Sequence, residues 1–435
     1  MKRKISILLL ILIFVIPTHI IYATNTASSD VRDSVIDSDF INSEIPNLNL
    51  YSEAAILIDS KTGSVLYSKN ANTKMYPAST TKILTAIIAI ENCNLNDIVT
   101  VHKSAISTIP AGYSSAYLSE GEKLTVNDLL TVLLVHSAND AGNVLAEYIS
   151  GSVQEFANLM NKKALEIGCQ NTHFTNPSGI HDDDHYTTAY DLSLIAKYCM
   201  RNSTFRNFVS SKSCTINSTN KFDIRKYSNT NDLINPSSKY YLKECIGIKT
   251  GYTSEAKNCL ISACSKDELE LICVVLGANQ TENGDSARYI DSKTLFNYGY
   301  SNFSIKTFAE KNTVIKNITI TNGTKDTRDL DLILEDSLSG LIKNDDEIPD
   351  PTIVLKENLS APIAKNSVVG TLNYTINGIS YTQNLLASND VTEDSLLIFI
   401  FKIILGIIIF LILIITLFSK SKKKKKRKSK YYRNY

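Results

Sequence analysis

The residues from 396 to 418 form an almost unbroken apolar run in which Lys402 is the only charged side chain. A helix needs about 20 consecutive apolar residues to cross the hydrocarbon core of a bilayer, and this run meets that length. Lys402 lies near one end of the run, where its ammonium group can extend to the interface. An amphipathic helix on the membrane surface is the alternative, but the segment has no polar face. We therefore expect residues 396–418 to form a transmembrane helix.

A second apolar stretch, residues 5–16, follows the basic start of the chain and leads to Ala23. A basic start, an apolar centre and a small residue at the end are typical of a secretory signal peptide. We predict a signal peptide over residues 1–23 with cleavage after Ala23. An uncleaved anchor stays open as the alternative, because the match to a small-residue cleavage site is loose. Residues 24–50 are polar and acidic and are predicted to be a linker.

Basic residues are concentrated at the two ends of the chain. Of its 45 Lys and Arg residues, 14 lie in residues 1–4, at 402 and in 420–433, whereas all 44 acidic residues lie between these ends. The body therefore carries 31 basic against 44 acidic residues, a net charge of −13. This acidic body argues against nucleic acid as a partner. The basic tail, residues 419–435, is typical of the cytoplasmic side of a membrane span, so the body is expected outside.

Three short motifs stand in order along the body: Ser79-Thr-Thr-Lys82, Ser137-Ala-Asn139 and Lys249-Thr-Gly251. Ser79 precedes a helical pattern of apolar residues, and Lys82 lies about one turn further along the same face. A serine at the start of a buried helix, beside a lysine, combines a nucleophile, a base and an orphan backbone N–H. The alternative is that Ser79 only caps the helix.

The other two motifs also have a suitable setting. The Ser137 motif follows the apolar run 129–135 and precedes a second helical pattern at 141–149, so we expect it on a turn between two helices. Capping of the second helix by Ser137 or Asn139 is the alternative. Residues 245–249, 258–264 and 269–277 read as an antiparallel meander, with Lys249 on a strand. An ordinary surface lysine before a turn is the alternative there.

Further copies of the motifs lie in settings that do not suit catalysis. Lys61-Thr-Gly63 separates two short apolar runs and is predicted to be a hairpin turn that uses Gly63 for a positive φ. Ser218-Thr-Asn-Lys221 lies in a polar run without helical periodicity. Ser254 also begins a Ser-x-x-Lys string, directly after the third motif.

On these motifs the chain resembles the low-molecular-weight penicillin-binding proteins of the serine-type D-alanyl-D-alanine carboxypeptidase family. The strings around Ser79, around Lys249 and over residues 174–179 have the character of that family. The resemblance implies an α/β (α+β) penicillin-binding/serine β-lactamase-like catalytic domain at 51–303, with helices on an antiparallel sheet. It also implies a small all-β domain at 304–390, which precedes the predicted transmembrane helix.

The resemblance implies an enzyme of peptidoglycan biosynthesis that needs no cofactor. Ser79 would attack the carbonyl of the penultimate D-alanine of a pentapeptide stem, with Lys82 as its base, and β-lactam antibiotics would acylate the same serine as covalent inhibitors. Ser137 would relay protons and Asn139 would orient the peptide. The remaining implied site residues bind substrate or form the oxyanion hole: Lys249, Thr250, Gly251, Tyr252 and Arg288. The rivals are a D,D-endopeptidase, a catalytically silent wall-binding protein and a β-lactamase, the last disfavoured because no Glu-x-x-Leu-Asn follows the second motif.

The cysteines and histidines give no further site. Eight scattered cysteines form no recognisable disulfide framework, and we expect most of them to be buried as small apolar side chains. His173, His181 and His185 share one segment with three aspartates, residues 182–184. Because their spacing does not match that of metal ligands, we expect a solvated loop there and no metal.

Overall fold

The computed structural model describes residues 46–394 and 396–431 of the chain. The predicted signal peptide and most of the predicted linker lie outside these residues. In the described part the linker prediction is wrong at its C-terminal end, because Leu50 is buried and Leu48 packs against the same apolar cluster. The backbone N–H groups of Tyr51 and Ser52 donate to the buried carboxylate of Asp291, at 3.1 and 2.6 Å.

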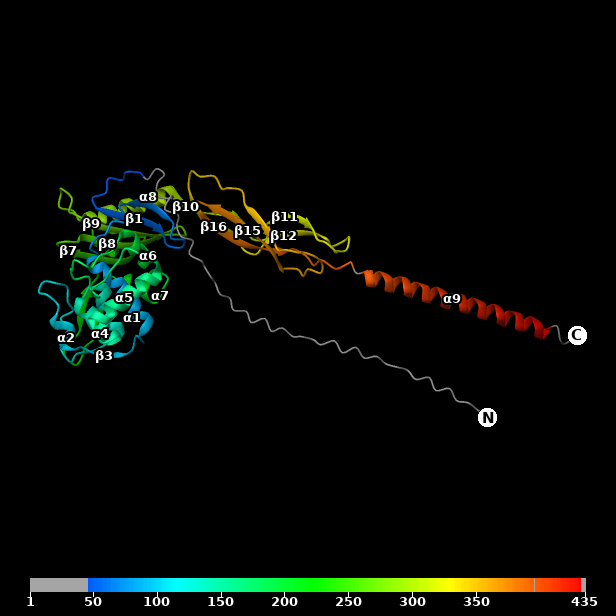
Figure 1. Ribbon diagram of the computed structural model, residues 1–435, viewed down its shortest axis with the longest axis horizontal. Coiled ribbons are helices and arrows are strands. Elements are labelled where there is room, and N and C mark those ends of the chain that lie inside the picture. Colours follow the sequence, from blue (N-terminus) through cyan, green and yellow to red (C-terminus); the bar gives the residue numbers. More distant parts are fainter. Residues whose placement is uncertain (1–45, 395, 432–435) are drawn as a thin grey trace, which may run out of the picture. The chain divides into compact units, whose positions relative to one another are not determined.

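The first domain is built on a five-stranded antiparallel sheet (Figure 1). Its strands, in spatial order, are β2 (Val65–Lys69), β1 (Ala54–Asp59), β9 (Leu269–Ala278), β8 (Lys257–Lys266) and β7 (Cys245–Thr253). The central strands are apolar on both sides: Ile56 faces one core cluster and Leu57 the other. A strand buried on both faces requires helices on both sides of the sheet.

The helices satisfy that requirement. One apolar cluster lies between the sheet and a large group of helices, and the other lies between the sheet and α8 (Ala287–Asn302), which Figure 1 shows on the opposite side. The large group consists of η2 (Ala78–Thr81), α1 (Lys82–Asn92), α2 (Lys103–Ser107), α3 (Val126–Val135), α4 (Asn139–Ser150), α5 (Val153–Ile167), α6 (Ala189–Met200) and α7 (Ser203–Val209). Two small two-stranded sheets and the short η3 (Asp232–Ile234) complete this domain. The sheets are β3 (Ile98–Thr100) with β4 (Lys123–Thr125) and β5 (Ser213–Ile216) with β6 (Arg225–Ser228).

The predicted turn at Gly63 and the predicted meander are confirmed. Gly63 joins β1 to β2 with φ +87°, as the hairpin interpretation of Lys61-Thr-Gly63 requires. The meander turn between β8 and β9 is formed by Asp267 and Glu268, which both adopt positive φ. Turns with positive φ at both central residues match the twist of antiparallel strands.

The second domain is all β. β10 (Phe303–Ala309) pairs with β13 (Leu338–Lys343), and a five-stranded antiparallel sheet follows the order β11 (Val314–Thr319), β12 (Asp329–Leu334), β16 (Ile379–Ala387), β15 (Val368–Ile376), β14 (Thr352–Leu355). Alternate residues of β12, such as Leu330 and Leu332, are fully buried in its core. The predicted fold class is therefore confirmed for both domains. The last helix, α9 (Leu396–Tyr431), contains an apolar segment, Phe399–Phe418, with a mean hydropathy of 3.1.

The loop between α5 and α6 is held together by internal hydrogen bonds and packs beneath η2. Asn176 Oδ1 accepts the backbone N–H groups of Ser178 and Gly179 at 3.1 and 2.8 Å. Gly179 has φ +76°, and a Cβ atom there would lie only 1.8 Å from the carbonyl oxygen of Ala78. Glycine is thus required for the loop to approach the turn that carries Ser79.

His185 joins this loop to η2, so the expectation of a solvated loop is wrong for this histidine. Its side chain is 2% exposed, whereas Asp182, Asp183 and His173 are exposed as expected. His185 Nδ1 accepts the backbone N–H of Thr175 at 3.1 Å, so the proton of the neutral ring lies on Nε2. Nε2 can then donate to Thr81 Oγ1, which is 2.9 Å away. Burial lowers the pKa of His185 to about 3.

The buried His185 predicts a loss of stability in acid. Because its folded pKa lies below the ordinary value of 6.5, the unfolded chain binds more protons between these values, and stability present above pH 6.5 falls as the pH falls. Between pH 7 and about pH 4.5 the free energy of unfolding falls by roughly 2–3 kcal/mol through His185. Chemical denaturation at both pH values measures the decrease in the free energy of unfolding. This decrease should be smaller in His185→Gln than in the wild type, by the contribution of His185. The exposed His173→Gln is the control and should follow the wild type; an equal loss in all three proteins would contradict the assignment.

Candidate active site

Ser79 lies in the one-turn helix η2, directly before α1. Its side chain is half-buried, and the preceding Ala78 holds φ +47°, a left-handed conformation that an alanine rarely adopts. Strain of this kind is kept where the surrounding contacts impose it, and here the loop at Gly179 and strand β7 both lie close to Ala78. The turn thereby presents Ser79 Oγ towards Lys82.

The Lys82 amine joins three segments of the domain. Its Nζ lies 2.8 Å from Ser79 Oγ, 2.6 Å from Asn139 Oδ1 and 2.7 Å from the carbonyl oxygen of Ser178. Lys82 is fully buried. Burial, and secondly the nearby positive charge of Lys249, hold the pKa of this amine well below its ordinary value. An amide oxygen and a carbonyl oxygen can only accept, so they bind two N–H bonds of the neutral amine and leave its lone pair for the Ser79 hydroxyl.

The second motif lies at the corner between α3 and α4. Ser137 has φ +70°, and Ala138 is the N-cap of α4, with no side-chain capping bond. The interpretation of Ser137 or Asn139 as a helix cap is therefore wrong. Asn139 is freed to bind Lys82, as described above. The carboxylate of the next residue, Asp140, is buried. It accepts hydrogen bonds from the Ser115 hydroxyl and from the backbone N–H groups of residues 116 and 118, which fixes the loop at residues 115–118 beside the corner.

The third motif lies within β7, the edge strand of the sheet next to η2. Lys249 is 1% exposed, and its Nζ donates to the carbonyl oxygen of Thr250 at 3.0 Å. The interpretation of Lys249 as a surface lysine is therefore wrong. Burial, followed by the charge of Arg288, lowers the pKa of Lys249 to about 7. Thr250 Oγ1 lies 2.6 Å from Thr230 Oγ1, which orients the hydroxyl group.

Gly251 permits β7 to approach the serine. A Cβ at this position would lie 3.0 Å from both the backbone nitrogen of Ser79 and the carbonyl oxygen of Pro77, closer than nearly all real Cβ contacts. The carbonyl oxygen of Gly251 accepts Arg288 Nη1 at 3.2 Å, and so Arg288, from the start of α8, reaches the same strand. The neighbouring Tyr252 side chain is 64% exposed.

The structure thus brings predicted residues together from η2, the α3–α4 corner, β7 and α8. Ser137 and Tyr252 adjoin this group in sequence, two residues before Asn139 and directly after Gly251. Sequence reasoning missed Ser178 and Thr230 as members of the site. The string 174–179 points to Ser178 only through the family resemblance, and nothing in the local sequence marks Thr230. The other motif copies lie elsewhere: Ser218 lies outside any helix or strand, and Lys257, of the Ser254 string, pairs with Glu53.

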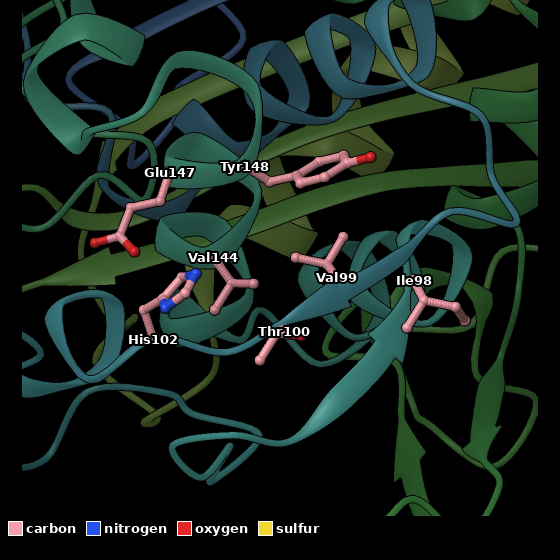
Figure 2. A pocket seen from close by; sticks show the side chains of 7 residues that line it. All are labelled: Ile98, Val99, Thr100, His102, Val144, Glu147 and Tyr148. Atoms are coloured by element: carbon pink, nitrogen blue, oxygen red, sulfur yellow. The ribbon is translucent and has the colours of Figure 1, made fainter.

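A surface cavity of about 380 Å³ is lined by residues other than these. Its lining comes from β3, from His102 at the start of α2 and from the C-terminal half of α4, with Glu147 and Tyr148 (Figure 2). None of the three motifs contributes to its lining. The motif residues, with their buried lysines and convergent polar groups, are therefore the candidate active site, and this cavity is not.

Comparisons with known proteins agree with this geometry. Residues 41–280 match the family described as D-alanyl-D-alanine carboxypeptidase, and residues 303–393 match the C-terminal domain of penicillin-binding protein 5. The chain is 34% identical to the D-alanyl-D-alanine carboxypeptidase DacF of Bacillus subtilis, over 74% of this chain and 80% of that protein. It is 30% identical to DacA of Haemophilus influenzae, over 78% and 84%.

A solved structure gives the same result in three dimensions. Penicillin-binding protein 5 from Haemophilus influenzae superposes with a TM-score of 0.61 at 29% identity, covering 80% of this chain and 99% of that one. The family match spans more than half of the chain and includes all three motifs. With its serine, its buried lysines and its second β domain in place, the chain belongs to the D-alanyl-D-alanine carboxypeptidase family of serine peptidases.

Proposed function

We propose that this protein removes the terminal D-alanine from peptidoglycan pentapeptide stems through an acyl-enzyme on Ser79. The observation that carries the proposal is the position of the Lys82 amine, which is buried, of lowered pKa and 2.8 Å from Ser79 Oγ. A neutral amine in this position can accept the serine proton at neutral pH, which an ordinary lysine cannot do.

The reaction then runs in two steps. Ser79 Oγ bonds to the carbonyl carbon of the penultimate D-alanine while its proton passes to Lys82. The peptide C–N bond breaks, and the leaving amine of the terminal D-alanine takes a proton through Ser137. Water hydrolyses the ester in the second step and restores the serine. The backbone N–H groups of Ser79 and Tyr252 stabilise the oxyanion in both steps.

Recognition of the substrate's terminal carboxylate falls to the third motif. Lys249 and the nearby Arg288, which bonds the carbonyl oxygen of Gly251, supply positive charge, and the Thr250 hydroxyl supplies a donor. A ligand carboxylate raises the pKa of Lys249 again and so is bound most strongly by its protonated form. Asn139 orients both Lys82 and the peptide. A β-lactam carries a carboxylate beside a strained amide and would acylate Ser79 by the same route.

We also propose that the protein is exported by its N-terminal segment and anchored by α9, with the catalytic domain outside the cell and the basic tail inside. The apolar segment Phe399–Phe418 supports this by its length and hydropathy, and the lysines that follow it in sequence support the orientation. Of the rivals, the silent wall-binding protein is disfavoured by the intact contact between Lys82 and Ser79.

Labelled penicillin tests the nucleophile. We expect the wild type to be labelled covalently and Ser79→Ala to lose at least about 1,000-fold in acylation rate, because no other oxygen is activated by Lys82. Ser218→Ala, which changes the serine of a second Ser-x-x-Lys string, is the matched control and should label normally. Thermal unfolding of Ser79→Ala checks that it is folded. Normal labelling of a folded Ser79→Ala protein would refute the mechanism.

The pH dependence of kcat/KM tests Lys249. Since its pKa is about 7 and its protonated form binds the carboxylate, kcat/KM on a pentapeptide should fall about tenfold per pH unit above that value. In Lys249→Arg the guanidinium stays protonated, and this alkaline decline should disappear even if the maximum is lower. A pentapeptide amidated at its C-terminus should be a poor substrate at every pH. The same alkaline decline in Lys249→Arg would assign the decline to another group.

Extraction tests the anchor. Full-length protein should remain in membranes washed with alkaline carbonate or high salt, because a spanning helix is held by its apolar surface and not by charge. Protein ending at Asp394 should be released and keep its activity on small peptides, since all three motifs precede the second domain. Release of the full-length protein by carbonate, or removal of the basic tail by protease added to intact cells, would contradict the topology.

A further inference from the structure

Two cysteines face each other across the edge of the catalytic sheet. Cys245 is the first residue of β7, and its Cα partner on β8 is Cys264. Both belong to the face of the sheet that packs against α8: Cys264 is part of that apolar cluster, and Cys245 packs against it. Two side chains on the same face of directly paired residues point in the same direction and touch.

The hydrogen-bond pattern shows that Cys245 and Cys264 form a non-hydrogen-bonded antiparallel pair, in which the two Cα atoms lie closer together than in a hydrogen-bonded pair. The backbone N–H of Ser265 donates to the carbonyl oxygen of Glu244 at 3.0 Å, so the ladder bond flanks the cysteines and does not join them. Residues in such a non-hydrogen-bonded pair have Cα atoms about 4.5 Å apart. This lies within the range of roughly 4.4–6.8 Å that a disulfide spans without backbone movement.

The two thiols differ in accessibility. Cys264 is fully buried, and burial, then a hydrogen bond with the Cys245 thiol, raises its pKa. Cys245 is half-buried at the start of the edge strand. An incoming reagent therefore meets Cys245 first, and Cys264 lies behind it within reach of its sulfur. A more accessible thiol in front of a buried one suits thiol–disulfide exchange in two steps.

We propose that Cys245 and Cys264 form a redox-active pair that closes to a cross-strand disulfide. The oxidant is a low-molecular-weight disulfide, RSSR. The Cys245 thiolate attacks one sulfur of RSSR, giving a mixed disulfide and releasing one RS⁻. Cys264 then loses its proton and attacks Cys245 Sγ, which releases the second RS⁻. Two protein thiols are oxidised and one RSSR is reduced to two thiols, and excess thiol reverses the reaction.

The consequence concerns the strand that carries the third motif. β7 has a strand neighbour on one side only, and its pairing with β8 is irregular between Cys245 and Gly247. A disulfide at Cys245 would fasten the start of this edge strand to β8, four residues before Lys249. Because a cross-link restricts the unfolded chain, the oxidised protein is expected to be the more stable form. The inference depends on the sheet register and not on the proposed function.

Peptide mapping of the full-length protein in detergent tests the bond. Protein incubated with glutathione disulfide, alkylated and digested with trypsin should yield residues 244–249 linked to residues 258–266. Cys259 lies in the second peptide, on the opposite face of the sheet, so Cys259→Ser should keep the link and Cys264→Ala should lose it. A link through Cys259 or Cys273, or two free thiols at 245 and 264 after complete incubation, would overturn the proposal.

Thermal unfolding gives an independent measurement that does not require the buried position to be changed. Oxidation should raise the Tm of the wild type by about 5–10 °C, and dithiothreitol should reverse the rise. Cys245→Ser should show no such rise. Cys214→Ser removes a half-buried thiol from another hairpin and should behave as the wild type. An equal rise in Cys245→Ser would mean that another thiol is responsible.

Discussion

The buried amine of Lys82 is the interaction on which the catalytic domain depends most. Its partners lie in three segments that are far apart in sequence: Asn139 is 57 residues away and Ser178 is 96 residues away. An unpaired buried amine is costly, so each acceptor must be in place for the domain to pack. The glycines at 179 and 251 serve the same end, since a Cβ would collide with η2 at residue 179 and would crowd it at residue 251.

Two lysines inside one domain oppose its stability. Lys82 and Lys249 are both fully buried, and each lies near another positive group. Like charges in a poorly solvated site favour the neutral forms of both amines, which is unfavourable for folding. The neutral form suits a base at Lys82, whereas a bound carboxylate would restore the positive charge of Lys249. The extensive apolar packing on both faces of the sheet offsets this cost. The domain is therefore less stable than it would be without the two buried lysines of its candidate active site.

Local patterns were sufficient for much of the fold. The turn at Gly63, the meander with its turn at Asp267, the helix after Ser79 and the apolar helix near the C-terminus all depend on neighbours in sequence. The contacts of Ser178 and Thr230 do not, because they arise only when distant segments meet. His185 was misjudged for the same reason: three adjacent aspartates indicated a solvated loop, yet the histidine turns inward to Thr81. The helix-cap interpretations of the second motif failed because Ala138 occupies the cap position.

The position of β1 in the sheet has a consequence for how the protein matures. β1 comes from the beginning of the catalytic domain but lies between β2 and β9, with Ala54 opposite Leu276. Pairing of such distant residues must overcome a large loop-closure entropy, so it is slow and late in folding. During synthesis the segment of β1 is made long before its partner exists. The catalytic sheet is therefore incomplete without β9, and a chain that ends before β9 lacks the strand that joins β1 to β8 and β7.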